Sequence, residues 1–194
     1  MLIYIHGFNS SPASAKAQVL KARLEALGHG AAFVAPALPH SPAEAATLLD
    51  GLAARHPDAA LVGSSLGGYY ATWLAEKRGL NAVLLNPAVR PYDLLRDFVG
   101  DQRNLYTGER YEFTARHVDE LQALEVASIT PDRYLLIVAT GDEVLDYRAA
   151  VARYRGCRQI LIEGGDHGLS GFAAYVDTLL EFCGIRRERA LPRL

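Results

Sequence analysis

Short runs rich in leucine and β-branched residues alternate along this chain with longer segments of helical periodicity, and this alternation limits the possible folds more than any other feature. Strands joined through helices run in the same direction, so the pattern predicts one mostly parallel sheet of about six strands with helices on both faces. The predicted strands are residues 2–5, 32–35, 59–62, 82–85, 134–139 and 159–162.

The chain length fits one domain of this α/β class. A chain of 194 residues can bury one substantial core but is too short for two ordinary enzyme domains. We therefore expect a single domain over residues 1–194.

Capping signals predict where several helices begin. Ser11 as N-cap and Pro12 as first helical residue predict a helix that ends before Gly28. The run Ser41-Pro42-Ala43-Glu44 is typical of a capping box. The apolar stripe of its helix should face the sheet and comprises Ala45, Leu48, Leu49 and Leu52. Further helices are predicted over residues 66–78, 148–155 and 171–183.

Residues 90–133 interrupt the alternation and contain two polar-rich helical stretches, near 92–98 and 115–126. Insertions of this length in a compact α/β domain are usually functional or mobile. The insertion therefore predicts either a small lid beside the site or ordinary packing on the surface.

Composition excludes several classes of partner. The apolar fraction is 50%, the charged fraction is 22% and the net charge is −2, so no field attracts nucleic acid or an anionic membrane. No stretch approaches the roughly 20 apolar residues of a membrane span, and no basic segment precedes the first strand. We expect a soluble cytoplasmic protein with a small-molecule substrate. The sequence does not indicate an oligomeric state.

Cys157 and Cys183 match no disulfide or zinc-binding spacing, which favours a reducing compartment and packed apolar roles for both. The basic segment 186–194 predicts a solvated tail.

The segment Gly63-Ser64-Ser65-Leu66-Gly67 places a G-x-S-x-G motif between a predicted strand and a predicted helix. In a nucleophile elbow the serine occupies a tight, strained turn, and crowding favours glycine two residues before it and two after it. The context predicts Ser65 as a nucleophile. The alternative role for Ser65 is that of a helix N-cap.

A serine hydroxyl needs a positioned base to become a good nucleophile. His167 lies between the last predicted strand and the last predicted helix, and loops at the carboxyl ends of parallel strands are where such folds build their sites. We predict His167 as the base. The other histidines have simpler structural explanations: His6, His29, His40, His56 and His117.

The acidic partner of the base should follow the penultimate strand, since the expected chain order is serine, then acid, then histidine. Asp142 comes directly after that strand and is the preferred candidate. Asp146 remains the alternative, with a possible role as N-cap of the helix that begins near residue 147.

Two backbone N–H groups are needed to bind an oxyanion. Leu66, which follows the nucleophile, should supply one, and Phe8 in the loop after the first strand should supply the other. A simple strand-ending turn is the alternative for that loop. Asn9 in the same loop and Leu95 and Phe98 in the insertion are expected to contact the substrate. Other apolar residues that could line an acyl pocket are Leu94, Tyr106, Tyr111 and Phe113.

These motifs resemble those of small bacterial YqiA-type esterases in the α/β-hydrolase superfamily. The resemblance covers nearly the whole chain and rests on residues 6–11, 63–68, 140–146 and 164–167. It implies a three-layer α/β-hydrolase fold with a trimmed sheet, because the oxyanion loop here follows the first strand. It also implies hydrolysis of carboxylic ester or acyl thioester bonds.

The motifs predict a serine hydrolase that works through an acyl-enzyme intermediate and requires no metal or organic cofactor, and the resemblance implies that it is an esterase. An acyltransferase on the same site is one alternative. A nucleotide- or phosphate-binding protein is another, because glycine-rich loops after parallel strands also bind phosphates. Neither G-x-G-x-x-G nor G-x-x-x-x-G-K-[ST] occurs in the chain.

Overall fold

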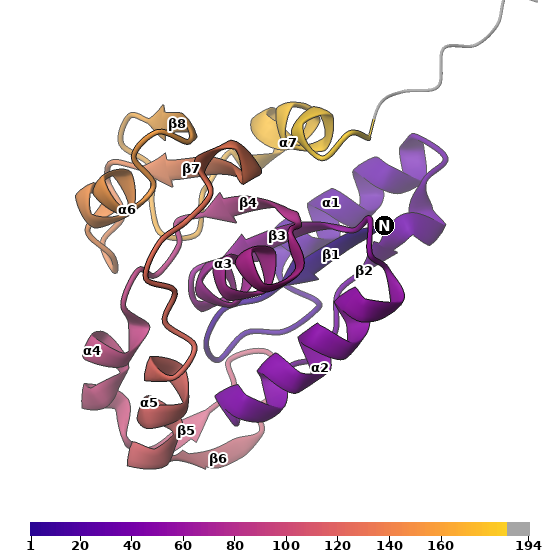
Figure 1. Cartoon of the computed structure of the whole chain (residues 1–194). Coiled ribbons are helices and arrows are strands. Elements are labelled where there is room, and N and C mark those ends of the chain that lie inside the picture. Colours follow the sequence, from indigo (N-terminus) through magenta and orange to yellow (C-terminus); the bar gives the residue numbers. More distant parts are fainter. Residues whose placement is uncertain (186–194) are drawn as a thin grey trace, which may run out of the picture.

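The six predicted strands form one parallel sheet in the computed structural model, which describes residues 1–185 (Figure 1). The strand order is β2-β1-β3-β4-β7-β8, and every neighbouring pair is parallel. The strands are β1 (Leu2–Ile5), β2 (Phe33–Val34), β3 (Ala60–Ser64), β4 (Asn81–Leu85), β7 (Tyr134–Ala139) and β8 (Arg158–Ile162). All carboxyl ends therefore lie at one edge, where the site is expected.

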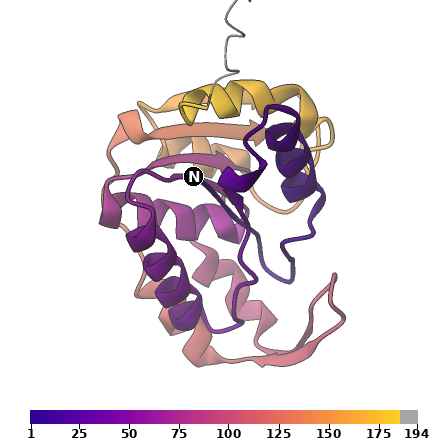
Figure 2. The same cartoon turned by 90° about the vertical axis from the view of Figure 1, so that its right-hand side faces the viewer.

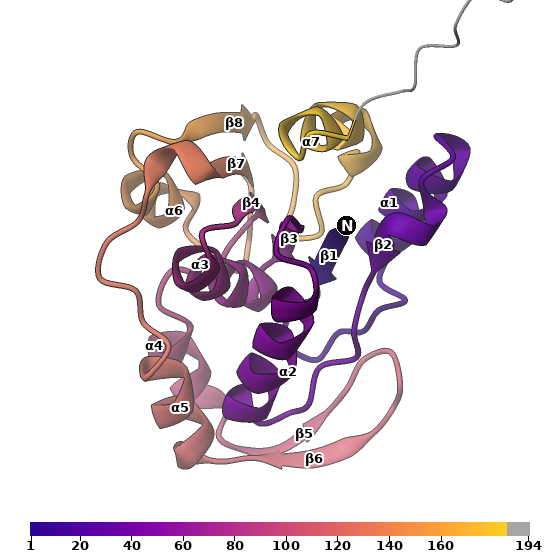
Figure 3. The same ribbon diagram turned by 45° about the vertical axis from the view of Figure 1, so that its right-hand side comes forward.

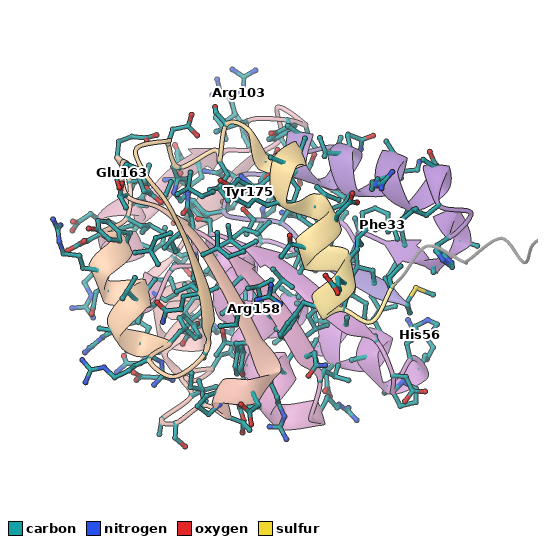
Figure 4. All side chains as sticks on the ribbon, turned by 90° about the horizontal axis from the view of Figure 1, so that it is seen from above. Phe33, His56, Arg103, Arg158, Glu163 and Tyr175 are labelled. Carbon is teal, nitrogen blue, oxygen red and sulfur yellow. The ribbon has the colours of Figure 1, made fainter. Side chains whose placement is uncertain are left out.

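Helices cover both faces of this sheet. On one face lie α1 (Ala15–Ala26) and α7 (Val176–Phe182), and on the other lie α2 (Pro42–Arg55), α3 (Leu66–Arg78) and α6 (Tyr147–Arg153). Because successive strand residues point to opposite faces, Leu61 joins the core under α2 and α3 while Val62 joins the core under α1 and α7. Figure 4, a view from above, labels Arg158 and Glu163 near opposite ends of β8. The predicted three-layer α/β fold is confirmed.

Two helix starts test the capping signals. Helix α2 begins as predicted, with Ser41 Oγ accepting a hydrogen bond from Glu44 N at 3.3 Å. The prediction for α1 was wrong by three residues. Ser11 Oγ accepts from Ala13 N at 3.0 Å and Ser11 O accepts from Ser14 N at 3.1 Å, so residues 11–14 form a turn before the helix.

One position of the predicted α2 stripe is also wrong. Leu48 is 37% exposed, whereas the buried side of α2 includes Ala45, Leu49, Leu52 and Ala53. The helix therefore faces the sheet through a rotated stripe.

The remaining connections are short. Four 3₁₀ turns occur in residues 1–185: Gly30–Ala32, Arg96–Phe98, Pro131–Arg133 and Phe172–Tyr175. The last of these replaces the first turns of the helix predicted over 171–183. The segment 186–194, predicted as a tail, lies outside the described residues. Within residues 1–185 no helix combines the length and the apolar character needed to cross a membrane.

The insertion contains more structure than its sequence predicted. It holds α4 (Pro91–Leu95), α5 (Ala115–Gln122) and an antiparallel hairpin of β5 (Gly100–Arg103) and β6 (Arg110–Phe113), which together lie at one end of the molecule (Figure 3). The hairpin projects as an arm in Figure 2. It was missed because its strands are short and mostly polar.

Candidate active site

Ser65 lies between β3 and α3 with φ 55° and ψ −121°, a conformation that is strained for a residue with a side chain. Glycine is required on both sides of this turn. A Cβ on Gly63 would lie 2.3 Å from Gly67 O, and a Cβ on Gly67 would lie 2.0 Å from Ile5 O. The structure therefore has the elbow geometry that the motif predicted.

His167 lies in the loop after β8, and its Nε2 is 3.1 Å from Ser65 Oγ. Its Nδ1 is 2.8 Å from Asp142 Oδ2 and 3.0 Å from Oδ1. A carboxylate only accepts hydrogen bonds, so Nδ1 carries the proton and Nε2 is left to accept from the Ser65 hydroxyl. The three predicted residues are thus brought into one hydrogen-bonded series.

The Asp142 side chain is only 2% exposed. Its Oδ1 accepts hydrogen bonds from Leu145 N at 2.8 Å and Val144 N at 2.9 Å. Burial alone would raise the pKa of Asp142, but the hydrogen bonds from His167 and these two backbone groups outweigh it and hold the pKa below the ordinary 3.8. Asp142 is therefore a carboxylate at neutral pH.

Asp146 is placed elsewhere. Its carboxylate is 61% exposed and accepts a hydrogen bond from Arg148 N at 3.0 Å, which makes it the N-cap of α6. The structure brings Asp142, and not Asp146, to His167.

Three side chains that sequence analysis did not single out hold the His167 loop. Glu143 Oε2 accepts from His167 N at 2.9 Å, and Lys16 Nζ donates to Gly168 O at 2.8 Å. Asn86 Nδ2 donates to the carbonyl oxygens of residues 166 and 167. Each comes from a different element, so local patterns contain little sign of them. The clearest signal was Asn86, a polar residue directly after a buried strand.

The loop after β1 packs directly against the elbow. A Cβ on Gly7 would lie 3.2 Å from Ser65 Cβ, and β1 is the neighbour of β3 in the sheet. Phe8 packs edge-to-face on Phe98 and Phe113, with ring centroids 6.1 and 5.3 Å apart. Of the two predicted oxyanion-binding residues, Leu66 therefore directly follows Ser65, and Phe8 lies in the loop that packs against it.

A cavity of about 230 Å³ opens beside Ser65 and His167. Its lining is mostly apolar and includes the predicted residues Leu95 and Phe98. The other lining residues are Phe8, Leu66, Ala88, Pro91, Leu94, Val144 and Leu145. Leu95 is buried in the core, whereas Phe98 is 43% exposed. The insertion thus both packs on the domain and forms one wall of the cavity.

Asn9, which was expected to contact the substrate, does not line this cavity. Asn9 Nδ2 donates to Gln102 Oε1 at 3.1 Å and its Oδ1 accepts from Tyr111 OH at 2.7 Å, so the amide holds the hairpin. Tyr111 and Phe113 line a separate pocket of about 40 Å³ with Asn9, and Tyr106 is half exposed.

Other reactive groups lie away from the site. Both cysteines are half-buried free thiols, and burial raises the pKa of Cys157 to about 11 and that of Cys183 to about 12. Among residues 1–185 no group of three or more histidine, cysteine or acidic side chains could hold a metal ion.

Solved structures that superpose on this chain include proteins described as hydrolases, esterases and lipases. A candidate hydrolase from Agrobacterium vitis S4 superposes with a TM-score of 0.75 at 17% identity, covering 94% of this chain and 87% of that one. Est1E from Butyrivibrio proteoclasticus gives 0.68 at 18% identity, covering 94% and 88%. Monoacylglycerol lipase from Paleococcus ferrophilus gives 0.67 at 16% identity, covering 95% and 94%. At such identities the likeness shows the fold alone.

The family is shown by the sequence. The model of the family described as "Uncharacterised protein family (UPF0227)" matches residues 1–184, nearly the whole chain. This match agrees with the resemblance to YqiA-type proteins that the motifs indicated. The chain belongs to the UPF0227 family.

Proposed function

We propose that this protein is a serine hydrolase that cleaves carboxylic ester or acyl thioester bonds, with Ser65 as nucleophile, His167 as base and Asp142 as its partner. The observation that carries the proposal is the hydrogen-bonded series of Asp142, His167 and Ser65, in which Ser65 and His167 line an apolar cavity. A strained serine with a base at 3.1 Å is the geometry expected of an activated nucleophile.

In the first step, Ser65 Oγ bonds to the carbonyl carbon while its proton moves to His167 Nε2. The carbonyl oxygen becomes an oxyanion, which accepts hydrogen bonds from the N–H groups of Leu66 and Phe8. The positive charge on His167 is stabilised by the ionised Asp142. The tetrahedral intermediate then expels the alcohol or thiol, which takes the proton from His167, and leaves an ester on Ser65.

In the second step, His167 Nε2 takes a proton from water as the water oxygen attacks the acyl-enzyme. The second tetrahedral intermediate collapses, Ser65 recovers its proton from His167 and the acid is released. No metal or organic cofactor takes part in either step.

The volume and apolar lining of the cavity support an apolar acyl group of short to medium length. A second cavity of about 190 Å³ adjoins the first, and the two share Ala88, Pro91, Leu94 and Leu145. Mostly apolar lining with few polar groups is typical of sites for such ligands. Two structural neighbours support this choice of substrate class. Est1E has been solved with ferulic acid, a carboxylic acid, bound, and another neighbour is named a monoacylglycerol lipase.

A panel of p-nitrophenyl esters and acyl-CoAs of increasing chain length tests the proposal, with Ser65→Ala as the control. We expect hydrolysis by the wild-type protein that the control loses. Activity that persists in Ser65→Ala, or no turnover of any ester or thioester, would contradict it. The same assay with an added alcohol distinguishes a hydrolase from an acyltransferase, because only the latter gives a new ester as its main product.

A further inference from the structure

Asn86 directly follows β4, the strand between the one that precedes Ser65 and the one that precedes Asp142. Its side chain is buried, with 3% of the residue exposed, and its φ is 41°. Asparagine is one of the few residues that adopt positive φ readily. A buried amide between the two strands needs partners, because an unsatisfied buried polar group costs free energy.

The amide of Asn86 has those partners on two sides. Its Nδ2 donates to Asp166 O at 3.0 Å and to His167 O at 3.2 Å. Its Oδ1 accepts from Ala139 N at 2.9 Å. Ala139 is the last residue of β7, three positions before Asp142. One side chain therefore connects the His167 backbone to the strand that carries Asp142.

The backbone around Asn86 extends this connection to the nucleophile. Ser65 N donates to Leu85 O at 3.0 Å, and Ala88 N donates to Ser65 O at 3.1 Å. Both bonds join the elbow to the segment that carries the amide. Residues 85–88 thus contact the backbone of Ser65, the end of β7 and the His167 loop at once.

We propose that Asn86 is a positioning residue for the triad. It fixes the position and orientation of the His167 imidazole relative to Ser65 and Asp142. This inference rests on the proposed function. Only an amide of this length meets all three partners, since the site requires two donated bonds and one accepted bond. Aspartate has nearly the same shape and tolerates positive φ, but its carboxylate would face two carbonyl oxygens without a hydrogen to share.

The test compares Asn86→Asp with Tyr134→Phe. The control removes a partly buried side-chain hydrogen bond, from Tyr134 OH to Glu76 Oε1 at 2.7 Å, at the amino end of β7 and away from the site. We expect Asn86→Asp to lower kcat about 10- to 100-fold with KM changed less than about threefold, because a small misplacement of a catalytic group costs up to about 10²-fold. Tyr134→Phe should keep the wild-type kcat even if its melting temperature falls as far as that of Asn86→Asp.

Proton NMR supplies a readout that does not need turnover. In the wild type, the hydrogen-bonded Nδ1–H of His167 should give a resonance far downfield, which Ser65→Ala should keep. Asn86→Asp should broaden or shift it, and Tyr134→Phe should not. Because this signal is independent of ester hydrolysis, it tests Asn86 even if the proposed function fails.

If Asn86→Asp does not fold, Asn86→Gly replaces it, since glycine accepts the positive φ and removes the amide without adding charge. We expect the same selective loss of kcat and the same change in the His167 resonance. A folded Asn86 variant with wild-type kcat and an unchanged resonance overturns the proposal. A loss of kcat that Tyr134→Phe reproduces in proportion to its loss of stability also overturns it.

Discussion

His167 Nε2 lies 3.1 Å from Ser65 Oγ, at the opposite side of the imidazole from Asp142. The ring nitrogen that accepts, Nε2, is hydrogen-bonded to Ser65, and the one that donates, Nδ1, is hydrogen-bonded to Asp142. Because Ser65 and His167 take part in the same proton transfer, loss of either residue should disable the same chemical step.

Ser65→Ala and His167→Ala should each lower kcat for ester hydrolysis by about 10⁴-fold or more, and the double variant should be little worse than either. The two residues act as a unit, so their effects do not add. Steady-state kinetics on one activated ester measures this. A fluorophosphonate probe should label the wild type and not Ser65→Ala. A double variant whose loss equals the product of the single losses would argue against a shared step.

Asp142→Asn and Asp146→Asn should have different effects. An amide at 142 cannot stabilise the imidazolium as a carboxylate does, so turnover should fall strongly while the protein stays folded. Asp146→Asn removes the charge from an exposed helix cap, where asparagine also serves, so both activity and melting temperature should change little. If Asp146→Asn is inactive and Asp142→Asn active, the two roles must be exchanged.

The lowered pKa of Asp142 predicts a pH-dependent contribution to stability. Because the folded-state pKa lies below the ordinary 3.8, the carboxylate contributes stability that is complete above the unfolded pKa and is lost as pH falls through the folded pKa. The melting temperature of the wild type should therefore exceed that of Asp142→Asn at pH 7, and the gap should narrow at about pH 3. Thermal unfolding at both pH values checks this. A difference in melting temperature that widens in acid would contradict the predicted direction of the pKa effect.

Leu94 and Phe98 should govern the preference for acyl chain length, because both line the cavity beside Ser65 and are partly exposed. In the wild type each added methylene that reaches apolar contact should raise kcat/KM up to about fourfold, from about 0.8 kcal/mol per buried CH₂. The Leu94→Ala, Phe98→Ala double variant should flatten this profile and leave acetate esters nearly unaffected. Val99→Ala is the matched control, since Val99 is similarly exposed but does not line the cavity. If the folded double variant keeps the wild-type dependence of kcat/KM on chain length, the insertion does not form the wall of the acyl pocket.

Gly67→Ala should prevent stable folding or sharply lower the melting temperature. The new Cβ would lie 2.0 Å from Ile5 O, and neither backbone can move without disturbing the sheet. Gly51→Ala is the control in the interior of α2, where the nearest atom to a new Cβ is Arg55 Nη1 at 3.9 Å. It should stabilise the protein by up to about 1 kcal/mol. Chemical denaturation of both variants tests the contrast, and a Gly67→Ala protein as stable as the wild type would contradict the crowded elbow.

Much of the fold was predictable from the sequence. The alternation of apolar runs with helical segments predicted six parallel strands, and the boundaries of α3 were predicted to the residue. The motif around Ser65 predicted the elbow, because the close approach of backbone segments there requires glycine at positions 63 and 67. At Gly63 the crowding comes from Gly67, four positions away, so a short sequence pattern records it directly.

The tertiary structure decided what depends on distant residues. Asp142 and Asp146 both follow β7, and only the packing of the β8 loop shows which carboxylate meets His167. The contacts of Asn86 and Asn9 likewise join segments 53 or more positions apart in the chain. A side-chain amide carries no local sign of its partner, because its hydrogen bonds are fixed by where the strands end in space rather than by the residues beside it.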